Sequence, residues 1–239
     1  VNGFYTSTNR GTSWTSNAVP YIYDGNSTPT VELSRGQSWY DMSLVVDPDT
    51  ATTVYAGGVE YIKSKDAGAT YKQITIWSPG AAPGYSGSQL LHADHHTLVF
   101  RPGNGSFGLF GCDGGVYRST NLRNTYPVFP TYKAINSGYN VTQYYSCAMA
   151  NTVASNYFLA GAQDNGTSKF GTPGLGGAYV VVGGDGGFCF IDQDNSNNQI
   201  ASYVQSNYYR SRDGGGLFSF LGTDNAGGFI NPCDLDNTN

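Results

Sequence analysis

The amino-acid sequence predicts an all-β chain built from repeated units of four short strands. A pattern of Ser-x-Asn/Asp-x-Gly between two aromatic residues occurs three times, at 5–14 (YTSTNRGTSW), 61–71 (YIKSKDAGATY) and 208–218 (YYRSRDGGGLF). No segment has helical periodicity of useful length, whereas short apolar runs alternate with turns rich in Gly, Asn and Asp. Both observations indicate strands joined by tight turns.

The repeated turn belongs to a longer repeat. Each unit reads as an apolar strand, a polar turn, an apolar strand, a Gly-rich turn, an aromatic-rich strand, the Ser-x-Asp/Asn turn and a short last strand. Four such units can be aligned, at 42–75, 95–121, 142–170 and 186–221. A period of about 40 to 50 residues with four strands per unit is typical of the blades of a β-propeller. We expect one propeller domain over 1–239, with about five blades represented.

Composition points to a protein outside the cell. Only 12% of the residues are charged, about half the usual ~25%, while Gly (33) and Tyr (19) are abundant. The net charge of −5 argues against nucleic acid or an anionic membrane as a partner, because both select basic surfaces. No apolar run approaches the ~20 residues of a membrane span. We therefore expect a secreted or cell-surface protein without membrane insertion.

The repeated turns are predicted to be structural. The Asn or Asp side chain can bond backbone amides of its own turn, Gly can adopt positive φ, and the aromatic residue can be buried beneath the hairpin. A fourth copy, Ser119-x-Asn121, is degenerate because Arg123 stands in place of Gly. The structural set is Ser7, Asn9, Gly11, Trp14, Ser64, Asp66, Gly68, Tyr71, Ser211, Asp213, Gly215 and Phe218.

These residues resemble a known motif. Ser-x-Asp-x-Gly-x-x-Trp is similar to the Asp box, or BNR repeat, of sialidases, sortilin-type propellers and xyloglucan-cleaving propeller enzymes. The succession HADHHTLVF, CDGGVYRST, AGAQDNGT and GGDGGFCFID resembles secreted, sortilin-like BNR propeller proteins of Bacteroidetes, which are substrates of type IX secretion. The resemblance covers about the whole chain and implies the fold and structural Asp boxes. It does not fix an activity, since one fold hosts many functions.

Propeller geometry separates the polar residues into two sets. The Asp-box turns lie on one face, and the starts of the first strands, together with the turns between second and third strands, lie on the other. Ligand sites of propellers usually occupy this second face. The candidate ligand-binding residues there are Asp41, His92, Asp94, His96, Asp113, Asp164, Asn165 and Asp185.

The stretch His92–His96 contains all three histidines of the chain. On an extended strand His92, Asp94 and His96 would point to one side. Because positions 92 and 96 would be about 13 Å apart, a metal site would use two of these three residues and an Asp of another blade. The alternative is a set of structural hydrogen bonds, and Asp113 and Asp164 can equally be ordinary Asp-Gly and Asp-Asn-Gly turns.

Other features leave their roles open. Three acidic pairs could attract calcium, although solvated turns explain them better: Asp47/Asp49, Asp192/Asp194 and Asp234/Asp236. No cofactor is required. The four cysteines, which lack a Cys-x-x-Cys pair, could form one or two disulfides or remain buried thiols: Cys112, Cys147, Cys189 and Cys233.

Three functions fit the sequence. The preferred one is a non-catalytic recognition or scaffold module that binds glycan or an extracellular protein, because aromatic platforms and amides suit sugars. The second is a glycoside hydrolase, which needs two carboxylates about 5 to 9.5 Å apart; its candidates are Asp94, Asp113, Asp164 and Asp185. The third is a structural subunit of a surface fibre or adhesin.

Both ends of the sequence read as half blades. Residues 1–16 look like a third strand, an Asp box and a fourth strand, and residues 228–239 look like a first strand and its turn. Unpaired strand edges invite association. The expectations are a fragment of a larger propeller, closure within the chain, or self-association through the terminal half blades, in that order of preference.

Overall fold

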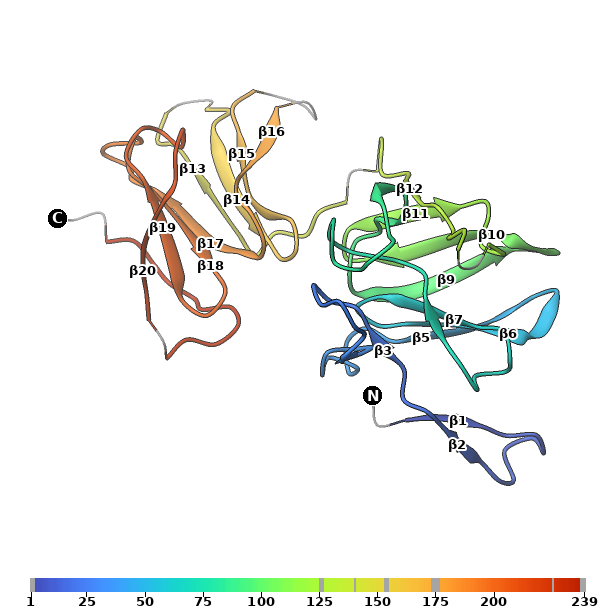
Figure 1. The fold of residues 1–239 in the computed structure, drawn as a ribbon. Coiled ribbons are helices and arrows are strands. Elements are labelled where there is room, and N and C mark those ends of the chain that lie inside the picture. The colour runs from blue at the N-terminus through green and yellow to red at the C-terminus, as the bar shows by residue number, and fades with distance from the viewer. Residues whose placement is uncertain are drawn as a thin grey trace. The chain divides into compact units, whose positions relative to one another are not determined.

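The computed structural model describes residues 3–124, 127–139, 141–152, 155–172, 177–224 and 226–236. The chain divides into two compact units, Val1–Asn140 and Val141–Asn239, and each is described by itself. Within the described residues the one helical element is a 3-10 turn at Gly87–Gln89, and every other regular element is a strand (Figure 1). The predicted all-β class is confirmed.

The first unit contains two hairpins and two four-stranded antiparallel sheets in its described part. The hairpins are β1 (Phe4–Thr6) with β2 (Thr15–Asn17), and β3 (Tyr21–Ile22) with β4 (Val31–Glu32). One sheet comprises β5 (Ser43–Asp47), β6 (Thr50–Gly57), β7 (Tyr61–Ser64) and β8 (Lys72–Gln73). The other comprises β9 (His95–Arg101), β10 (Asn104–Cys112), β11 (Gly115–Ser119) and β12 (Lys133–Ala134).

The second unit contains two four-stranded antiparallel sheets in its described part. One comprises β13 (Ser146–Met149), β14 (Phe158–Ala162), β15 (Gly166–Phe170) and β16 (Ala178–Val182). The other comprises β17 (Gly186–Ile191), β18 (Gln199–Tyr203), β19 (Asn207–Ser211) and β20 (Ser219–Thr223). In all four large sheets each strand pairs with its neighbour in the sequence, which is the up-and-down arrangement expected of a propeller blade.

Each unit has its own apolar core. In the first, one cluster joins the two large sheets through Tyr55, Tyr61 and Phe110, all fully buried, and a second surrounds Ile22 and Leu33. In the second, a smaller cluster comprises Ala150, Leu159, Cys189 and Ile191. All four cysteines of the chain are free thiols.

The three intact Ser-x-Asn/Asp turns share one hydrogen-bond pattern. In the copy at Ser64, its hydroxyl donates to Asp66 at 2.7 Å and accepts from the amide of Gly68 at 2.8 Å, while Asp66 also accepts from the amide of Thr70 at 2.8 Å. Gly68 has a φ of 93°, a backbone conformation that glycine adopts without strain because it has no Cβ. The same bonds recur at Ser7 and at Ser211.

The degenerate turn at Ser119 explains why the fourth strand of its sheet lies late in the sequence. The side chain of Asn121 accepts from the amide of Thr131 at 2.9 Å, ten residues along, instead of closing a tight turn. The predicted unit 95–121 therefore contains three strands, and β12 follows at Lys133. Arg123 lacks the conformational freedom that glycine gives the intact turns.

The expected burial of the turn aromatics is wrong for Trp14, which is 63% exposed. Its hairpin has only two strands, so the ring lies over its own turn, where Nε1 donates to the carbonyl of Gly11 at 3.1 Å. Tyr71 and Phe218 are half-buried and pack against the cores of their respective units.

The strand expected at the C-terminal end is not present in residues 229–236. Asn231 instead folds back on Gly228, accepting from its amide at 2.7 Å and donating to its carbonyl at 2.8 Å. Pro232, which has no amide hydrogen, also disfavours a sheet ladder there. At the other end, β1 pairs with β2 as expected. No helix in the described part of the chain has the length and apolar character needed to cross a membrane.

Candidate functional site

A cluster of polar and aromatic side chains lies in the first unit, where three segments meet. The first segment is a compact turn from Gln37 to Asp41, in which the amides of Tyr40 and Asp41 both donate to the carbonyl of Gln37. The second precedes β9 and includes Asp94, whose φ of 63° bends the chain before the strand begins. The third is the tight turn between β10 and β11, which carries Asp113. We call this set the polar cluster: Gln37, Trp39, Tyr40, Asp41, Asp94, His96 and Asp113.

Asp113 is the centre of one half of the polar cluster. The hydroxyl of Tyr40 donates to its Oδ2 at 2.9 Å, and Nε2 of His96 lies 2.6 Å from its Oδ1. The rings of Tyr40 and His96 meet edge to face, with centroids 5.0 Å apart. Two residues of distant segments are thus held in place by one carboxylate.

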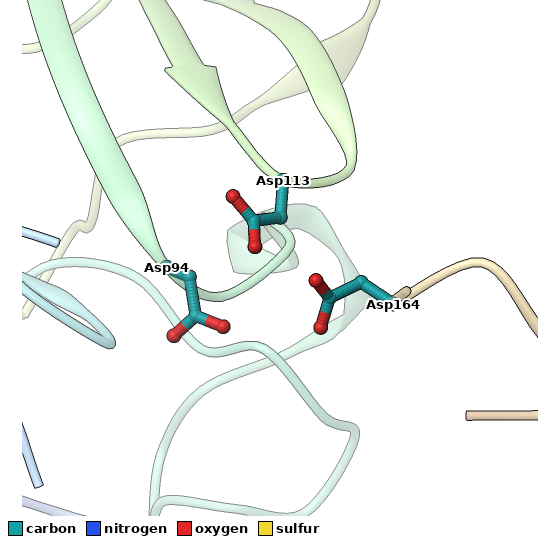
Figure 2. Close-up of side chains that lie close together, drawn as sticks. All are labelled: Asp94, Asp113 and Asp164. Atoms are coloured by element: carbon teal, nitrogen blue, oxygen red, sulfur yellow. The ribbon is translucent and has the colours of Figure 1, made fainter. Parts of the chain in front are cut away.

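Asp94 and Asp41 form the other half. The amide of Gln37 donates to Asp94 at 2.5 Å and to Asp41 at 3.2 Å, so one side chain bridges the two carboxyl groups. A carboxylate oxygen of Asp94 lies within 4.8 Å of one of Asp113. Figure 2 shows these two side chains close together at the start of β9 and at the hairpin turn. Asp164, which is also drawn there, belongs to the second unit and is described with it.

Burial shifts the acidity of these groups. Asp41 is fully buried, and its Oδ1 has no hydrogen-bond partner among the described residues. Burial raises the pKa of Asp41 to about 6, with the charge of Asp94 adding to the effect and the Gln37 bond opposing it. Burial and then the charge of Asp113 also raise the pKa of Asp94. The polar cluster therefore holds a carboxyl group that takes up a proton close to neutral pH.

An exposed aromatic surface lies beside these acids. Trp39 is 84% exposed, and its ring centroid lies 5.7 Å from that of Tyr40, which is 41% exposed. Because Tyr40 also bonds to Asp113, the aromatic surface is directly connected to the acidic groups. The polar cluster thus places an exposed apolar ring next to fixed hydrogen-bonding groups.

The structure brings some of the sequence candidates together and separates others. Asp41, Asp94, His96 and Asp113 belong to the polar cluster. The side chain of His92 packs against Gly114, next to Asp113, and its Nδ1 lies 3.2 Å from the carbonyl of Ala93. A metal site of two of His92, Asp94 and His96 and a further Asp was expected, but within the described residues no group of three ligand atoms within 4.8 Å of one another contains two of these three residues. The positive φ of Asp94 interrupts the extended strand assumed for the stretch.

The candidates of the second unit occupy two turns of that unit. Asp164, with a φ of 59°, lies between β14 and β15, and its amide donates to Oδ1 of Asp185 at 3.1 Å. Asn165 donates to the carbonyl of Gln163 at 3.0 Å. The bonds of Asp185 and Asn165 to backbone atoms stabilise the turn itself.

Sequence reasoning missed several residues of the first unit. Gln37, Trp39 and Tyr40 lie in an irregular segment without periodicity, although Asp41 beside them was a candidate. Fully buried His95 has no hydrogen-bond partner on either ring nitrogen within the described chain, and burial lowers its pKa to about 3. Glu60 is also fully buried; it accepts from Thr75 and the amide of Trp77, and burial raises its pKa to about 8.

Comparison with known proteins identifies the fold. No protein-family profile and no curated protein matches the chain. Among solved structures, it is similar to the GH74 xyloglucanase of Xanthomonas campestris, with 15% identity and a TM-score of 0.56 over 93% of this chain and 32% of that one. It is also similar to the GH74 enzyme of Niastella koreensis, with 14% identity and a TM-score of 0.35 over 92% of this chain and 38% of that one. A third similar structure is YCF48 from Cyanidioschyzon merolae, with 11% identity and a TM-score of 0.26 over 91% of this chain and 65% of that one.

With its four-stranded antiparallel sheets and its similarity to the xyloglucanase, the chain has a β-propeller fold. It spans about a third of that enzyme's length. At this identity the likeness extends to the fold and not to an activity.

Proposed function

We propose that this chain is part of an extracellular Asp-box propeller that binds glycans through the polar cluster of its first unit, without cleaving them. The observation that supports this most strongly is the exposed ring of Trp39 beside Tyr40, His96 and Asp113. A sugar presents C–H groups on its faces and hydroxyls on its rim. Trp39 offers a surface for the first, and the fixed polar groups offer partners for the second.

The test measures glycan binding by calorimetry. Xyloglucan oligosaccharides are the first probe, because the xyloglucanase shares the fold, followed by an array of neutral and acidic oligosaccharides. Trp39→Ala should abolish measurable binding. Trp14→Ala is the matched control, because Trp14 is also largely exposed and lies in the β1–β2 turn. Equal loss in both variants, or no binding across the array, would reject the proposal.

Glycoside hydrolysis is the second candidate. Asp94 and Asp113 have carboxylate oxygens within 4.8 Å of each other, and retaining glycosidases place their two carboxyl groups about 5 to 5.5 Å apart. The raised pKa of Asp94 suits a general acid. Asp113 suits a nucleophile less well, because Tyr40 and His96 already engage both of its oxygens. Reducing-sugar release from xyloglucan that disappears in both Asp94→Asn and Asp113→Asn would favour this candidate over the recognition module.

A further inference from the structure

A pocket in the first unit shares no residue with the polar cluster. It has a volume of about 430 Å³ and is lined mainly by aromatic rings, and its volume lies within the range of about 300 to 1,000 Å³ for ligand sites. The rings come from separate segments: β3, the end of the Ser64 turn, and the loops after β8 and β11. They are Tyr21, Tyr23, Tyr71, Tyr85 and Phe129.

Ring contacts and hydrogen bonds hold the wall of the pocket together. Tyr85 and Phe129 stack with ring centroids 4.3 Å apart and planes 26° from parallel. The hydroxyl of Tyr85 donates to the carbonyl of Gln73 at 2.6 Å, and the side chain of Gln73 accepts from the amide of Tyr23 at 2.7 Å. Gln73 also donates to the carbonyl of Thr75 at 2.8 Å. Its polar groups are therefore engaged in building the wall.

The remaining polar groups of the pocket restrict its ligand. The charged lining residue is Lys72, which is exposed, and no carboxylate contributes to the lining. A cationic ligand is disfavoured for that reason. The hydroxyls of Tyr21, Tyr23 and Tyr71 form no hydrogen bond within the described chain and can donate, as can the ammonium of Lys72. The hydroxyls can also accept, but Lys72 only donates and Gln73, the amide in the lining, is already engaged, so the lining offers more free donors than free acceptors and suits a ligand that mainly accepts.

From this combination we infer that the pocket binds a proline-rich peptide segment in the polyproline II conformation. Such a segment lacks amide hydrogens at each proline and presents its carbonyls as acceptors, which match the free hydroxyl and ammonium donors. Its pyrrolidine rings pack against aromatic walls, and its conformation is formed before binding, so little entropy is lost. Pro29 and Pro83 at the pocket add further rigid apolar surface.

The test titrates the folded chain with a capped decaproline peptide. Tyr21→Ala is the informative variant, because Tyr21 is 54% exposed and contributes little to the core. Tyr179→Ala, at an equally exposed tyrosine of the second unit, is the matched control. We expect saturable binding that weakens about tenfold or more in Tyr21→Ala and is unchanged in Tyr179→Ala and in Trp39→Ala.

Three results would overturn the inference. The first is the absence of saturable binding to decaproline by a chain whose circular dichroism shows the native fold. The second is equal weakening in Tyr21→Ala and Tyr179→Ala, which would indicate non-specific contact. The third is saturable binding of a neutral oligosaccharide that depends on Tyr21 and excludes the peptide, which would make the pocket a sugar site.

Discussion

The two units use aspartates that precede glycine in different ways. In the first unit Asp113 lies in a tight turn and holds the side chains of Tyr40 and His96. In the second, Asp185 accepts from the backbone amide of Asp164, and it also bonds the hydroxyl of Tyr203, whose pKa rises mainly through burial. An Asp before Gly thus organises a side-chain cluster in the first unit, whereas in the second it connects two turns by a hydrogen bond to the backbone. The difference comes from Tyr40 in the segment Gln37–Asp41 and from His96 on β9, which give Asp113 two side-chain partners.

The cores of the two units differ as well, and a substitution in the larger one should have the largest effect on stability. Phe110 is fully buried between Tyr61 and Tyr132, with ring centroids 5.0 and 5.3 Å away. Phe110→Ala should lower the free energy of unfolding by about 3 to 5 kcal/mol, as measured by urea denaturation. Phe220→Ala, at a ring 57% exposed in the second unit, should change it by less than about 0.5 kcal/mol. Similar losses in both variants would contradict this assignment of the core.

The Ser-x-Asp turns should respond alike in both units, because they share one hydrogen-bond pattern. Gly68 and Gly215 have φ values of 93° and 76°, and an added Cβ would come within 2.9 Å of Tyr71 and 2.6 Å of Tyr157, respectively. Each Gly→Ala substitution should therefore cost about 1 to 3 kcal/mol in thermal or urea unfolding. A control is Gly80→Ala, which has positive φ but open space around it. A cost at Gly80 equal to the other two would show that backbone strain alone is responsible.

The pH dependence of stability should be dominated by the first unit, which buries Glu60 and His95. The folded-state pKa of Glu60 is raised from 4.5 to about 8, so the folded chain keeps a proton that the unfolded chain releases, and stability falls as the pH rises from about 4.5 to about 8. The folded-state pKa of His95 is lowered from 6.5 to about 3, so its contribution rises with pH up to about 6.5. The two effects oppose each other between about pH 4.5 and 6.5. Above about pH 6.5 only the effect of Glu60 changes the free energy of unfolding with pH.

Urea denaturation at a series of pH values tests this. Between pH 6.5 and 8 the free energy of unfolding should fall by up to ~1.4 kcal/mol per pH unit. Glu60→Gln should remove most of this slope, because glutamine keeps the shape and carries no proton to lose. Asp66→Asn is a control at an exposed acid, whose pKa is lowered to about 2 by its bonds to Thr70 and Ser64 and which does not titrate in this range. An unchanged slope in Glu60→Gln would refute the assignment.

The sequence predicts the repeating part of this fold well, and the irregular part poorly. Strands and intact turns are predictable because Gly, Asp and Ser have local backbone preferences that act at fixed spacing. Where Arg123 replaces glycine, the turn lengthens and the fourth strand moves beyond the expected unit. Asp41, Asp94, His96 and Asp113 could be named as candidates, but their partners Gln37 and Tyr40 could not, since long-range contacts of an irregular segment leave no periodic signal. Buried Glu60 and His95 run against the general rule that ionisable residues are exposed.

Alanine substitutions of Asp113 and Asp185 test the two roles of aspartate most directly, although their expected effects on stability are the smallest. Asp113→Ala removes the acceptor that orients Tyr40 and His96, so glycan affinity should fall about tenfold. Because these two rings lie at the surface, the loss of folding stability should be only about 1 kcal/mol. Asp185→Ala removes the acceptor of a backbone amide in the second unit and should cost about as much stability, while glycan affinity stays at the wild-type value. Calorimetric titration with the glycan, alongside urea denaturation of both variants, measures the two quantities. If Asp185→Ala weakened glycan binding as much as Asp113→Ala, the polar cluster of the first unit would not be the whole binding site. If neither variant did, the sugar would bind elsewhere and Asp113 would be a structural turn residue like its counterpart.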